Sequence, residues 1–310
     1  MAHKTHALFS FLQEKTAEFM QSSVNDMELS EPEPLFDAPL LGVAAGDDPL
    51  WLRYQEEYIG AFHWTPLQAF QHAFVDARAV LAGELFVFVW ILPQTAATKF
   101  DNRREKKYPS ERWARSRILG EKKVNEGLQL FLLAELAKKG VQAVAPQLLP
   151  QWSGQTSERY GFACTWSERH AAYAAGLGTF GLCDGLITPL GKAMRAGSLV
   201  IRRALPVSER PYTHHREYCL YFQDGSCAVC VKRCPVGSVL TGGRDKKPCR
   251  WYLQTHCAPY LEQSWNLKGY GCGLCQTGVP CESGIPRRIV RHRLGGTKKL
   301  GHFAKPLPGM

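Results

Sequence analysis

The cysteines of this chain are concentrated in one short stretch. Nine of the eleven lie between Cys219 and Cys281, and only Cys164 and Cys183 come earlier. Disulfide frameworks belong mainly to small secreted proteins. This chain has 310 residues, and it begins with neither a basic segment that leads into an apolar one nor a twin-arginine motif. We therefore expect a cytoplasmic protein, without a membrane span, whose clustered cysteines bind metal.

The cysteines form two groups by their spacing. The first reads Cys219-x7-Cys227-x2-Cys230-x3-Cys234-Pro235, and the second has Cys249 and Cys257 followed by Cys272-x2-Cys275-x5-Cys281. Bacterial-type ferredoxins use C-x2-C-x2-C-x3-C-P, in which three cysteines hold one [4Fe–4S] cluster and the fourth ligates the other. The reason is geometric, because a tight loop can supply only three of the four thiolates that a cubane needs.

This pattern predicts two [4Fe–4S] clusters with crossed ligands, and hence a protein that transfers single electrons. The first cluster is assigned to Cys219, Cys227, Cys230 and Cys281. The second is assigned to Cys234, Cys249, Cys272 and Cys275. Cys257 is left over.

Two alternatives to this assignment remain open. Asp224 stands three residues before Cys227, where the ferredoxin pattern has its first cysteine, so an Asp ligand is an alternative to Cys219. The two C-x2-C pairs, 227/230 and 272/275, could instead form a zinc ribbon with four cysteine ligands. That site would leave Cys234-Pro235 without a purpose, and we favour the clusters.

Helical and extended patterns alternate ahead of the cysteines. Thr65-Pro66 predicts the start of a helix that runs to about Gly83. The apolar run from Leu85 to Ile91 predicts a buried strand, residues 120–140 a helix and residues 141–145 a short strand. The acidic, proline-containing stretch 28–49 is interpreted as a connector. This alternation favours an α+β fold.

We divide the chain into three parts on this basis. Residues 1–210 are expected to form a layered α/β domain, residues 211–290 a ferredoxin-like domain with both clusters, and residues 291–310 a basic tail.

Basic residues are in modest excess. The formal net charge is +10, and two oxidised clusters of about −2 each would lower it to roughly +6. Residues 101–117 hold seven Lys or Arg against three Asp or Glu. This stretch is interpreted as a solvated helix face, with a surface for an anionic ligand as the alternative.

Two features resemble one family. The segment from Ser167 to Gly181, SERHAAYAAGLGTFG, is similar to E-R-x-x-A-x-x-A-G-L-G-W-x-G, and Cys249 lies shortly before Trp251-Tyr252-Leu253 within the cysteine module. Together they resemble the epoxyqueuosine reductases, which are related to the cobalamin-dependent reductive dehalogenases. The resemblance covers roughly residues 160–285.

The resemblance implies a nitroreductase-like, cobalamin-binding first domain whose cobalt is reduced through the clusters. Family members remove the oxygen of an epoxide in a tRNA base. The residues expected at the corrinoid are Arg169, Gly176, Gly178, Gly181, Leu186, Ala196, Gly197 and Leu199. From the residues alone, the glycines favour tight turns or a close approach to a flat ligand, with plain helix termination as the alternative. Glu168 is expected to pair with Arg169 or to cap the helix start.

The chain departs from the family at its catalytic acid. The family's Asp lies six residues before the Glu of the E-R pair, and that position is Phe162 here. Tyr160 and Glu158 are weak candidates for the missing proton donor. The family's tRNA-gripping repeats would follow the module, where this chain has about thirty residues, so we expect a divergent short member.

We therefore predict a reductase that passes electrons from two clusters to a corrinoid, for a small-molecule or nucleoside substrate. Its electrons would come from a low-potential donor of the ferredoxin or flavodoxin type. One alternative is an electron-transfer protein without a corrinoid that serves a partner enzyme. The other is a tRNA-modifying reductase that uses residues 103–117 and 287–305 as a phosphate track.

Overall fold

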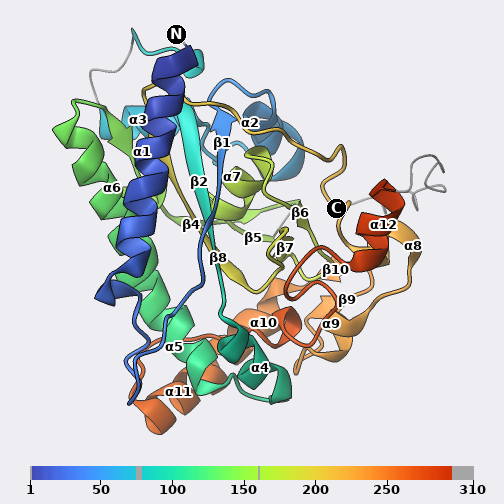
Figure 1. Cartoon of the computed structure of the whole chain (residues 1–310). Coiled ribbons are helices and arrows are strands. Elements are labelled where there is room, and N and C mark those ends of the chain that lie inside the picture. Colours follow the sequence, from blue (N-terminus) through green and yellow to red (C-terminus); the bar gives the residue numbers. More distant parts are fainter. Residues whose placement is uncertain (1, 75–78, 160, 295–310) are drawn as a thin grey trace.

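A four-stranded antiparallel sheet forms the centre of the computed structural model, which describes residues 2–74, 79–159 and 161–294 (Figure 1). The strand order is β1-β2-β8-β3. The bounds are Leu40–Ala45 for β1, Phe86–Pro93 for β2, Met194–Ile201 for β8 and Ala143–Val144 for β3. β2 pairs with β8 along its full length, from Phe86 opposite Ile201 to Pro93 opposite Met194. The other elements pack around these two central strands.

Both faces of the sheet are buried. Side chains alternate along β2, so Val87 and Val89 enter one hydrophobic cluster while Phe88 and Trp90 enter another. The helices α1 (Ala2–Gln21) and α6 (Glu126–Lys138) cover the hydrophobic cluster of Phe88 and Trp90 on one face. The hydrophobic cluster of Val87 and Val89, on the other face, extends into the cysteine-rich segment and includes Cys219 and Cys230. The cysteine-rich segment is thus packed directly against the core of the sheet.

Short elements complete the fold. Before the cysteines these are α2 Leu50–Arg53, α3 Pro66–Ala73, α4 Ala96–Arg104, α5 Glu111–Leu119, β4 Gly154–Ser157, β5 Gly161–Cys164, α7 Glu168–Ala174, β6 Thr179–Phe180 and β7 Leu186–Ile187. In the cysteine-rich segment they are α8 Leu220–Asp224, α9 Val229–Lys232, β9 Val239–Leu240, β10 Gly243–Arg244, α10 Lys246–Tyr252, α11 Ala258–Trp265 and α12 Arg287–Leu294. Figure 1 shows α11 of this second set below the sheet beside α5, and α8 and α12 to the right of the sheet.

The α+β class, the buried strand at β2 and the helix at α6 are confirmed, the helix after a wider π-helical turn over Gly120–Asn125. Two predictions were wrong. The helix that starts at Pro66 ends at Ala73, and Val80 is already buried in the core beyond it. The connector 28–49 contains β1, because its apolar run Leu40–Ala45 pairs with β2.

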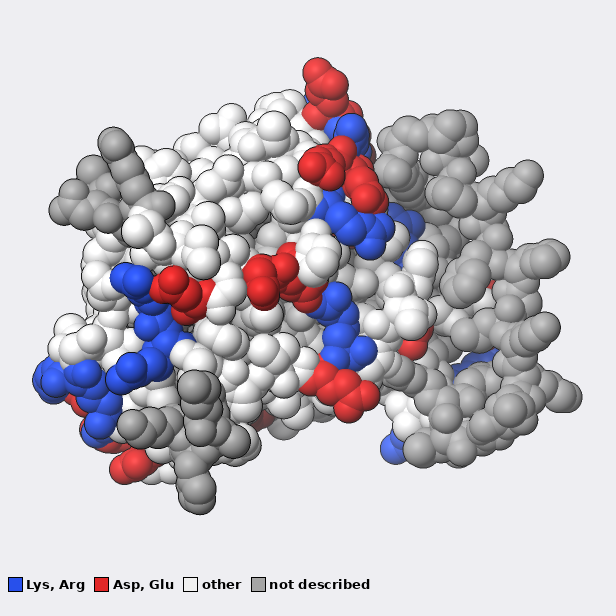
Figure 2. Space-filling model, turned by 90° about the horizontal axis from the view of Figure 1, so that it is seen from above, with Lys and Arg blue, Asp and Glu red and all other residues white. Residues whose placement is uncertain are grey.

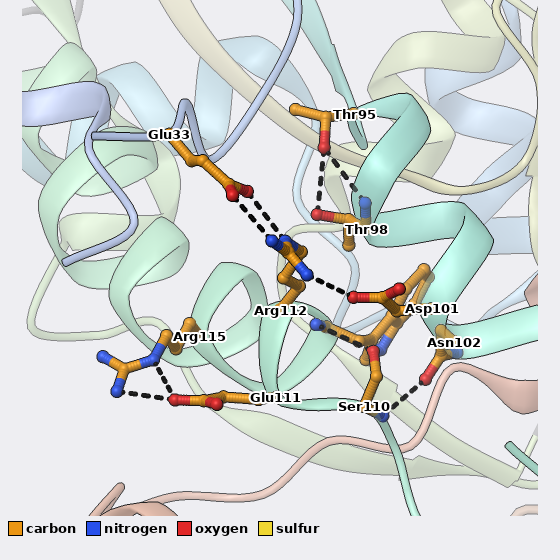
Figure 3. Close-up of polar contacts among 10 residues, drawn as sticks. Glu33, Thr95, Thr98, Asp101, Asn102, Ser110, Glu111, Arg112 and Arg115 are labelled. Carbon is orange, nitrogen blue, oxygen red and sulfur yellow. Dashed lines mark hydrogen bonds and ion pairs between the residues drawn. The ribbon is translucent and has the colours of Figure 1, made fainter. Parts of the chain in front are cut away.

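Ion pairs neutralise much of the basic segment 101–117. Arg112 bridges Glu33 and Asp101 at 2.6 and 2.5 Å, and Arg115 pairs with Glu111 at 2.8 Å (Figure 3). On the face seen in Figure 2, basic and acidic side chains likewise lie beside one another. The structure therefore favours the solvated helix face over a surface for an anionic ligand. None of the helices in the described residues has the length and apolar character to cross a membrane.

Candidate functional site

Four cysteines surround a small internal space of about 20 Å³, which we call the first cysteine cavity. They are Cys219, Cys227, Cys230 and Cys281. Cys219 directly precedes α8 and Cys230 lies in α9. Gly225 follows α8 with a φ of 71°, a backbone conformation that lets the chain turn back toward Cys227. The sequence thus brings three cysteines together locally, and a fourth reaches them from about fifty residues later.

A second space of about 190 Å³, the second cysteine cavity, is lined by Cys183 and by four further cysteines that form a second quartet. They are Cys234, Cys249, Cys272 and Cys275. The loop that carries the last two depends on Gly273, which has a φ of 66°. A Cβ atom there would lie 1.9 Å from Cε2 of Trp113 in α5. Only glycine lets this loop pack against the buried indole and keep both cysteines at the cavity.

The cysteines outside these quartets are accounted for by contacts. Cys257 is fully buried and its thiol interacts with that of Cys272. Cys183 is buried and its thiol interacts with Cys230 of one quartet and Cys275 of the other. Cys164 donates from Sγ to the carbonyl oxygen of Trp166 at 2.9 Å. The alternative ligand Asp224 is exposed and pairs with Arg288 at 3.2 Å, away from the first cysteine cavity.

The structure also bears on the zinc alternative. The pair 227/230 lines one cysteine cavity and the pair 272/275 lines the other. In the described residues, no three His, Cys, Asp or Glu side chains converge closely enough for one metal ion. A cubane makes a different demand, because each of its four irons takes a separate thiolate. The two separate quartets therefore suit two cubanes better than one shared zinc.

A third space, of about 440 Å³, adjoins the second cysteine cavity, and we call it the large cavity. Its wall residues are Ile59, His63, Phe162, Ala163, Cys164, Ser167, Arg169, His170, Phe180, Asp184, Arg244, Lys246, Cys249, Arg250, Leu253 and Tyr270. Five of these also line the second cysteine cavity: Arg169, Arg244, Cys249, Leu253 and Tyr270. A volume of this size suits a small organic ligand. One cysteine quartet and the large cavity thus share a wall.

Cations dominate the wall of the large cavity. Arg169, Arg244, Lys246 and Arg250 line it against one carboxylate, that of Asp184. The Lys246 ammonium donates to the backbone carbonyl of Phe162 at 2.7 Å. Burial lowers the pKa of Lys246 to about 8, against the opposing pull of Asp184. This amine therefore carries a proton at neutral pH that it can release readily.

Two buried histidines form another part of the wall. Nδ1 of His63 lies 3.1 Å from the carbonyl oxygen of Cys164. Because a carbonyl oxygen only accepts hydrogen bonds, Nδ1 carries the proton. Nε2 is then a bare acceptor, buried and without a hydrogen-bond partner in the described structure. Burial lowers the pKa of His63 to about 4 and that of His170 well below its usual range. Both rings are neutral at physiological pH.

The residues expected at the corrinoid separate into two sets. Arg169, Gly181 and Leu186 line one or more of the three cavities. The other five, Gly176, Gly178, Ala196, Gly197 and Leu199, line none of the three. Gly176, with a φ of 78°, would place a Cβ 2.2 Å from the Glu209 carbonyl oxygen, and Gly178 would place one 2.3 Å from that of Ile187. These two glycines make room for the protein's own backbone.

Glu158, one of the two candidate proton donors, does not line the large cavity. Glu158 is exposed in the turn between β4 and β5, and Tyr160 lies outside the described residues. The expected helix cap by Glu168 was wrong: its carboxyl oxygens are buried beside Trp166 and Ser198 without a hydrogen bond of normal geometry. Burial raises the pKa of Glu168 to about 8, so this carboxyl is largely protonated at neutral pH.

The sequence patterns did not identify several residues that line the large cavity. His63 lies a hundred residues before the segment it contacts, and no local motif marks it. Lys246 and Arg244 do have a weak signal, because they precede Cys249 within the cysteine module. Their proximity to a predicted ligand could have made them candidates.

The chain is similar to curated epoxyqueuosine reductases. It is 30% identical to that of Bacillus anthracis over 125 residues and 32% identical to that of Listeria monocytogenes over 124 residues. Each match covers 38% of this chain and 30% of the relative, so the matched part is less than a third of the length of these relatives. No family model matches the chain. The resemblance expected from the sequence is thereby confirmed.

Solved structures match this chain only at low sequence identity. The epoxyqueuosine reductase from Bacillus subtilis superposes with a TM-score of 0.48 at 16% identity, covering 92% of this chain and 68% of the other. A catabolic reductive dehalogenase in complex with 3-bromo-4-hydroxybenzoic acid gives a TM-score of 0.47 at 13% identity, covering 90% and 37%.

Proposed function

We propose that this chain is an iron–sulfur reductase in which two [4Fe–4S] clusters deliver single electrons to the large cavity. The observation that carries the proposal is the arrangement of eight cysteines in two quartets, one of which shares a wall with that cavity. The similarity to epoxyqueuosine reductases supports the same chemistry. The division into a first domain over residues 1–210 and a ferredoxin-like domain over 211–290 belongs to this proposal.

The polar atoms around the cavities suit a ligand that carries hydrogen-bonding groups. In the described structure, buried Nε atoms of Arg195 and Arg244, both at the second cysteine cavity, and Nε2 of His63 have no hydrogen-bond partner. Buried donors and acceptors of this kind are normally satisfied. We propose that a corrinoid side chain or substrate satisfies them. When bound, the corrinoid would supply a reducible cobalt centre, and the protein its orientation and dry surroundings.

The residues of the large cavity would handle protons. Reductive removal of an oxygen from an organic substrate consumes two electrons and two protons, with the oxygen leaving as water. The electrons would come one at a time from an external ferredoxin- or flavodoxin-type donor. We assign one proton to the Lys246 ammonium, which stands at Phe162 with its pKa lowered to about 8. The bare Nε2 of His63 would accept a hydrogen bond from the substrate.

The substrate we propose is a small molecule or nucleoside with an acceptor or anionic group. The wall cations Arg169, Arg244, Lys246 and Arg250 would hold such a group. A tRNA substrate is the second candidate, since one solved epoxyqueuosine reductase structure holds an epoxyqueuosine-modified tRNA stem loop. The pairing of Arg112 and Arg115 with carboxylates reduces the charge available for a phosphate track over residues 103–117.

A single preparation tests this proposal. The protein is purified without oxygen, and its absorption spectrum is recorded alongside iron, sulfide, zinc and cobalt analysis. We expect about eight irons and eight sulfides per chain, and uptake of cob(II)alamin in equal amount. Zinc without sulfide would overturn the proposal. Intact clusters that bind no corrinoid would leave an electron-transfer protein serving a partner enzyme.

A further inference from the structure

One lysine is buried between the two cysteine quartets. Lys192 is 2% exposed, in the loop between β7 and β8. It lines the first cysteine cavity and also the second. Its backbone amide donates to the carbonyl oxygen of Cys281 at 2.8 Å, which fixes the residue to a member of the first quartet. Lys192 is therefore in contact with both proposed cluster sites at once.

The fold makes specific room for this side chain. A Cβ atom at Gly185 would lie 2.7 Å from Cδ of Lys192, so the absence of a side chain at position 185 leaves space for the lysine stem. The preceding residue, Gly191, has a φ of 93°, and a Cβ there would lie 2.1 Å from the carbonyl oxygen of Glu282. Two glycines thus allow the lysine to be placed at this depth.

Sulfur atoms of several cysteines surround the Lys192 ammonium. Nζ lies 3.2 Å from Sγ of Cys183, whose thiol in turn interacts with one cysteine of each quartet. The other groups with the largest electrostatic influence on the ammonium are the sulfurs of Cys230, Cys275 and Cys281. A buried charge is costly unless an opposite charge compensates it. Neutral thiols supply no such charge, whereas two oxidised clusters would supply about −2 each.

We propose that Lys192 is the shared counter-ion of the two [4Fe–4S] clusters and raises the reduction potential of both. The inference rests on the proposed function, because it requires a cluster in each cysteine cavity. Each cluster gains negative charge when it accepts an electron. A fixed positive charge in the dry space between the clusters stabilises that charge, since net charge and hydrogen bonds to the sulfurs set cluster potentials. Lys192 is thus a positioning residue for electron transfer rather than a cluster ligand.

The test is an anaerobic redox titration of the reconstituted protein, followed by electron paramagnetic resonance. Lys192→Met keeps the length of the side chain and removes its charge. We expect the equilibrium constant for electron uptake to fall at least tenfold at both clusters, a shift of about 59 mV for a one-electron couple. The matched control is Lys232→Met, an exposed lysine two residues from Cys230. Water screens that charge, so we expect less than a threefold change.

Iron and sulfide content separates the outcomes. Lys192→Met with eight irons and potentials within threefold of the unmodified protein would overturn the inference and leave the clusters standing. Iron loss from Lys192→Met, with retention in Lys192→Arg, would support it, since the charge is then needed for assembly. Iron loss from both would overturn it, because the shape of the lysine would then be what the site requires. An unmodified protein without sulfide would overturn the proposed function itself.

Discussion

Nη2 of Arg244 lies 2.6 Å from Sγ of Cys249, and both residues line the large cavity as well as the second cysteine cavity. A charge-assisted hydrogen bond to a cluster thiolate draws electron density from the sulfur and favours the reduced cluster. The same guanidinium faces the space where a substrate or corrinoid would lie. If a cluster occupies the second cysteine cavity as proposed, an electron that leaves it through Cys249 would reach the large cavity without crossing another layer of the protein.

The first prediction concerns the cysteines. Cys230→Ser should lose about half of the iron or more, because Cys230 lines the first cysteine cavity with three other cysteines. Cys257→Ser is the matched control: Cys257 is just as buried but lies outside both quartets, and we expect it to keep about eight irons. Iron and sulfide analysis after anaerobic reconstitution measures both. Equal iron loss in the two variants would contradict the assignment of ligands.

The second prediction concerns Gly273. Gly273→Ala would force a Cβ into the Trp113 indole, at 1.9 Å in the present geometry, and would also strain a backbone with a φ of 66°. We expect the second quartet to fail, with loss of about half of the iron. Gly237→Ala shares the positive φ, at 62°, but its Cβ would meet nothing within 4 Å. That control should cost only about 1 kcal/mol and keep both clusters.

The third prediction concerns Lys246. With its pKa lowered to about 8 by burial, its amine becomes neutral well below the range of an ordinary lysine. The charged groups that act on it are Asp184, Arg169, Arg244 and Cys164. The rate of acylation of Lys246, followed by mass spectrometry of the labelled peptide, should level off above pH 8. A rate that instead kept rising up to pH 10 would refute the assignment.

The fourth prediction concerns Glu168, whose pKa burial raises to about 8. The folded state then binds a proton that the unfolded state has lost between about pH 4.5 and 8, so stability falls as pH rises through this range. Glu168→Gln removes this pH-dependent loss of stability. At pH 9 the variant should be at least about 1 kcal/mol more stable, a rise of roughly 2 °C in the thermal midpoint. The exposed Glu158→Gln should leave the thermal midpoint at pH 9 unchanged, and a destabilised Glu168→Gln at pH 9 would contradict the argument.

The sequence predicted those features that depend on residues close together in the chain. The run from Leu85 to Ile91 predicted a strand because a continuous apolar stretch of that length can be buried on both faces. The strand prediction rests on short-range geometry that tertiary contacts did not override. Cysteine spacing predicted the two groups of four that line the two cysteine cavities, and their role as cluster ligands stays a prediction.

The remainder of the site depends on contacts between distant segments. Gly176 matched a family motif, yet its missing side chain accommodates the backbone of Glu209 rather than a ligand. His63 and Lys192 reach their cavities only when distant segments pack together, because His63 contacts Cys164 and Lys192 contacts Cys281. No pattern within a window of the sequence encodes that proximity. β1 was missed for a related reason, because its pairing with β2 outweighed the prolines and acids around it.

The last prediction concerns Phe162, which occupies the position where the resemblance places a catalytic Asp. The Arg250 guanidinium lies 4.8 Å from the centre of the Phe162 ring, and the Lys246 ammonium donates to the Phe162 carbonyl. An Asp at 162 would therefore stand beside two cations, which hold the pKa of a carboxyl low and make it a poor acid. We expect the unmodified protein and Phe162→Asp to reduce an epoxyqueuosine-containing tRNA stem loop poorly. The double variant Phe162→Asp/Arg250→Met should do so at least tenfold faster than Phe162→Asp.

Controls make this prediction specific. Binding of cob(II)alamin, followed by electron paramagnetic resonance, must be equal in all variants before turnover is compared, and Arg250→Met alone measures the loss of the exposed cation without a new acid. If Phe162→Asp alone restores turnover, the two cations do not hold the carboxylate ionised, and the electrostatic argument fails. Robust turnover by the unmodified protein would show that a group already in the large cavity supplies the proton. In that case Lys246→Met should abolish it, because Lys246 is the donor that stands where the Asp is missing.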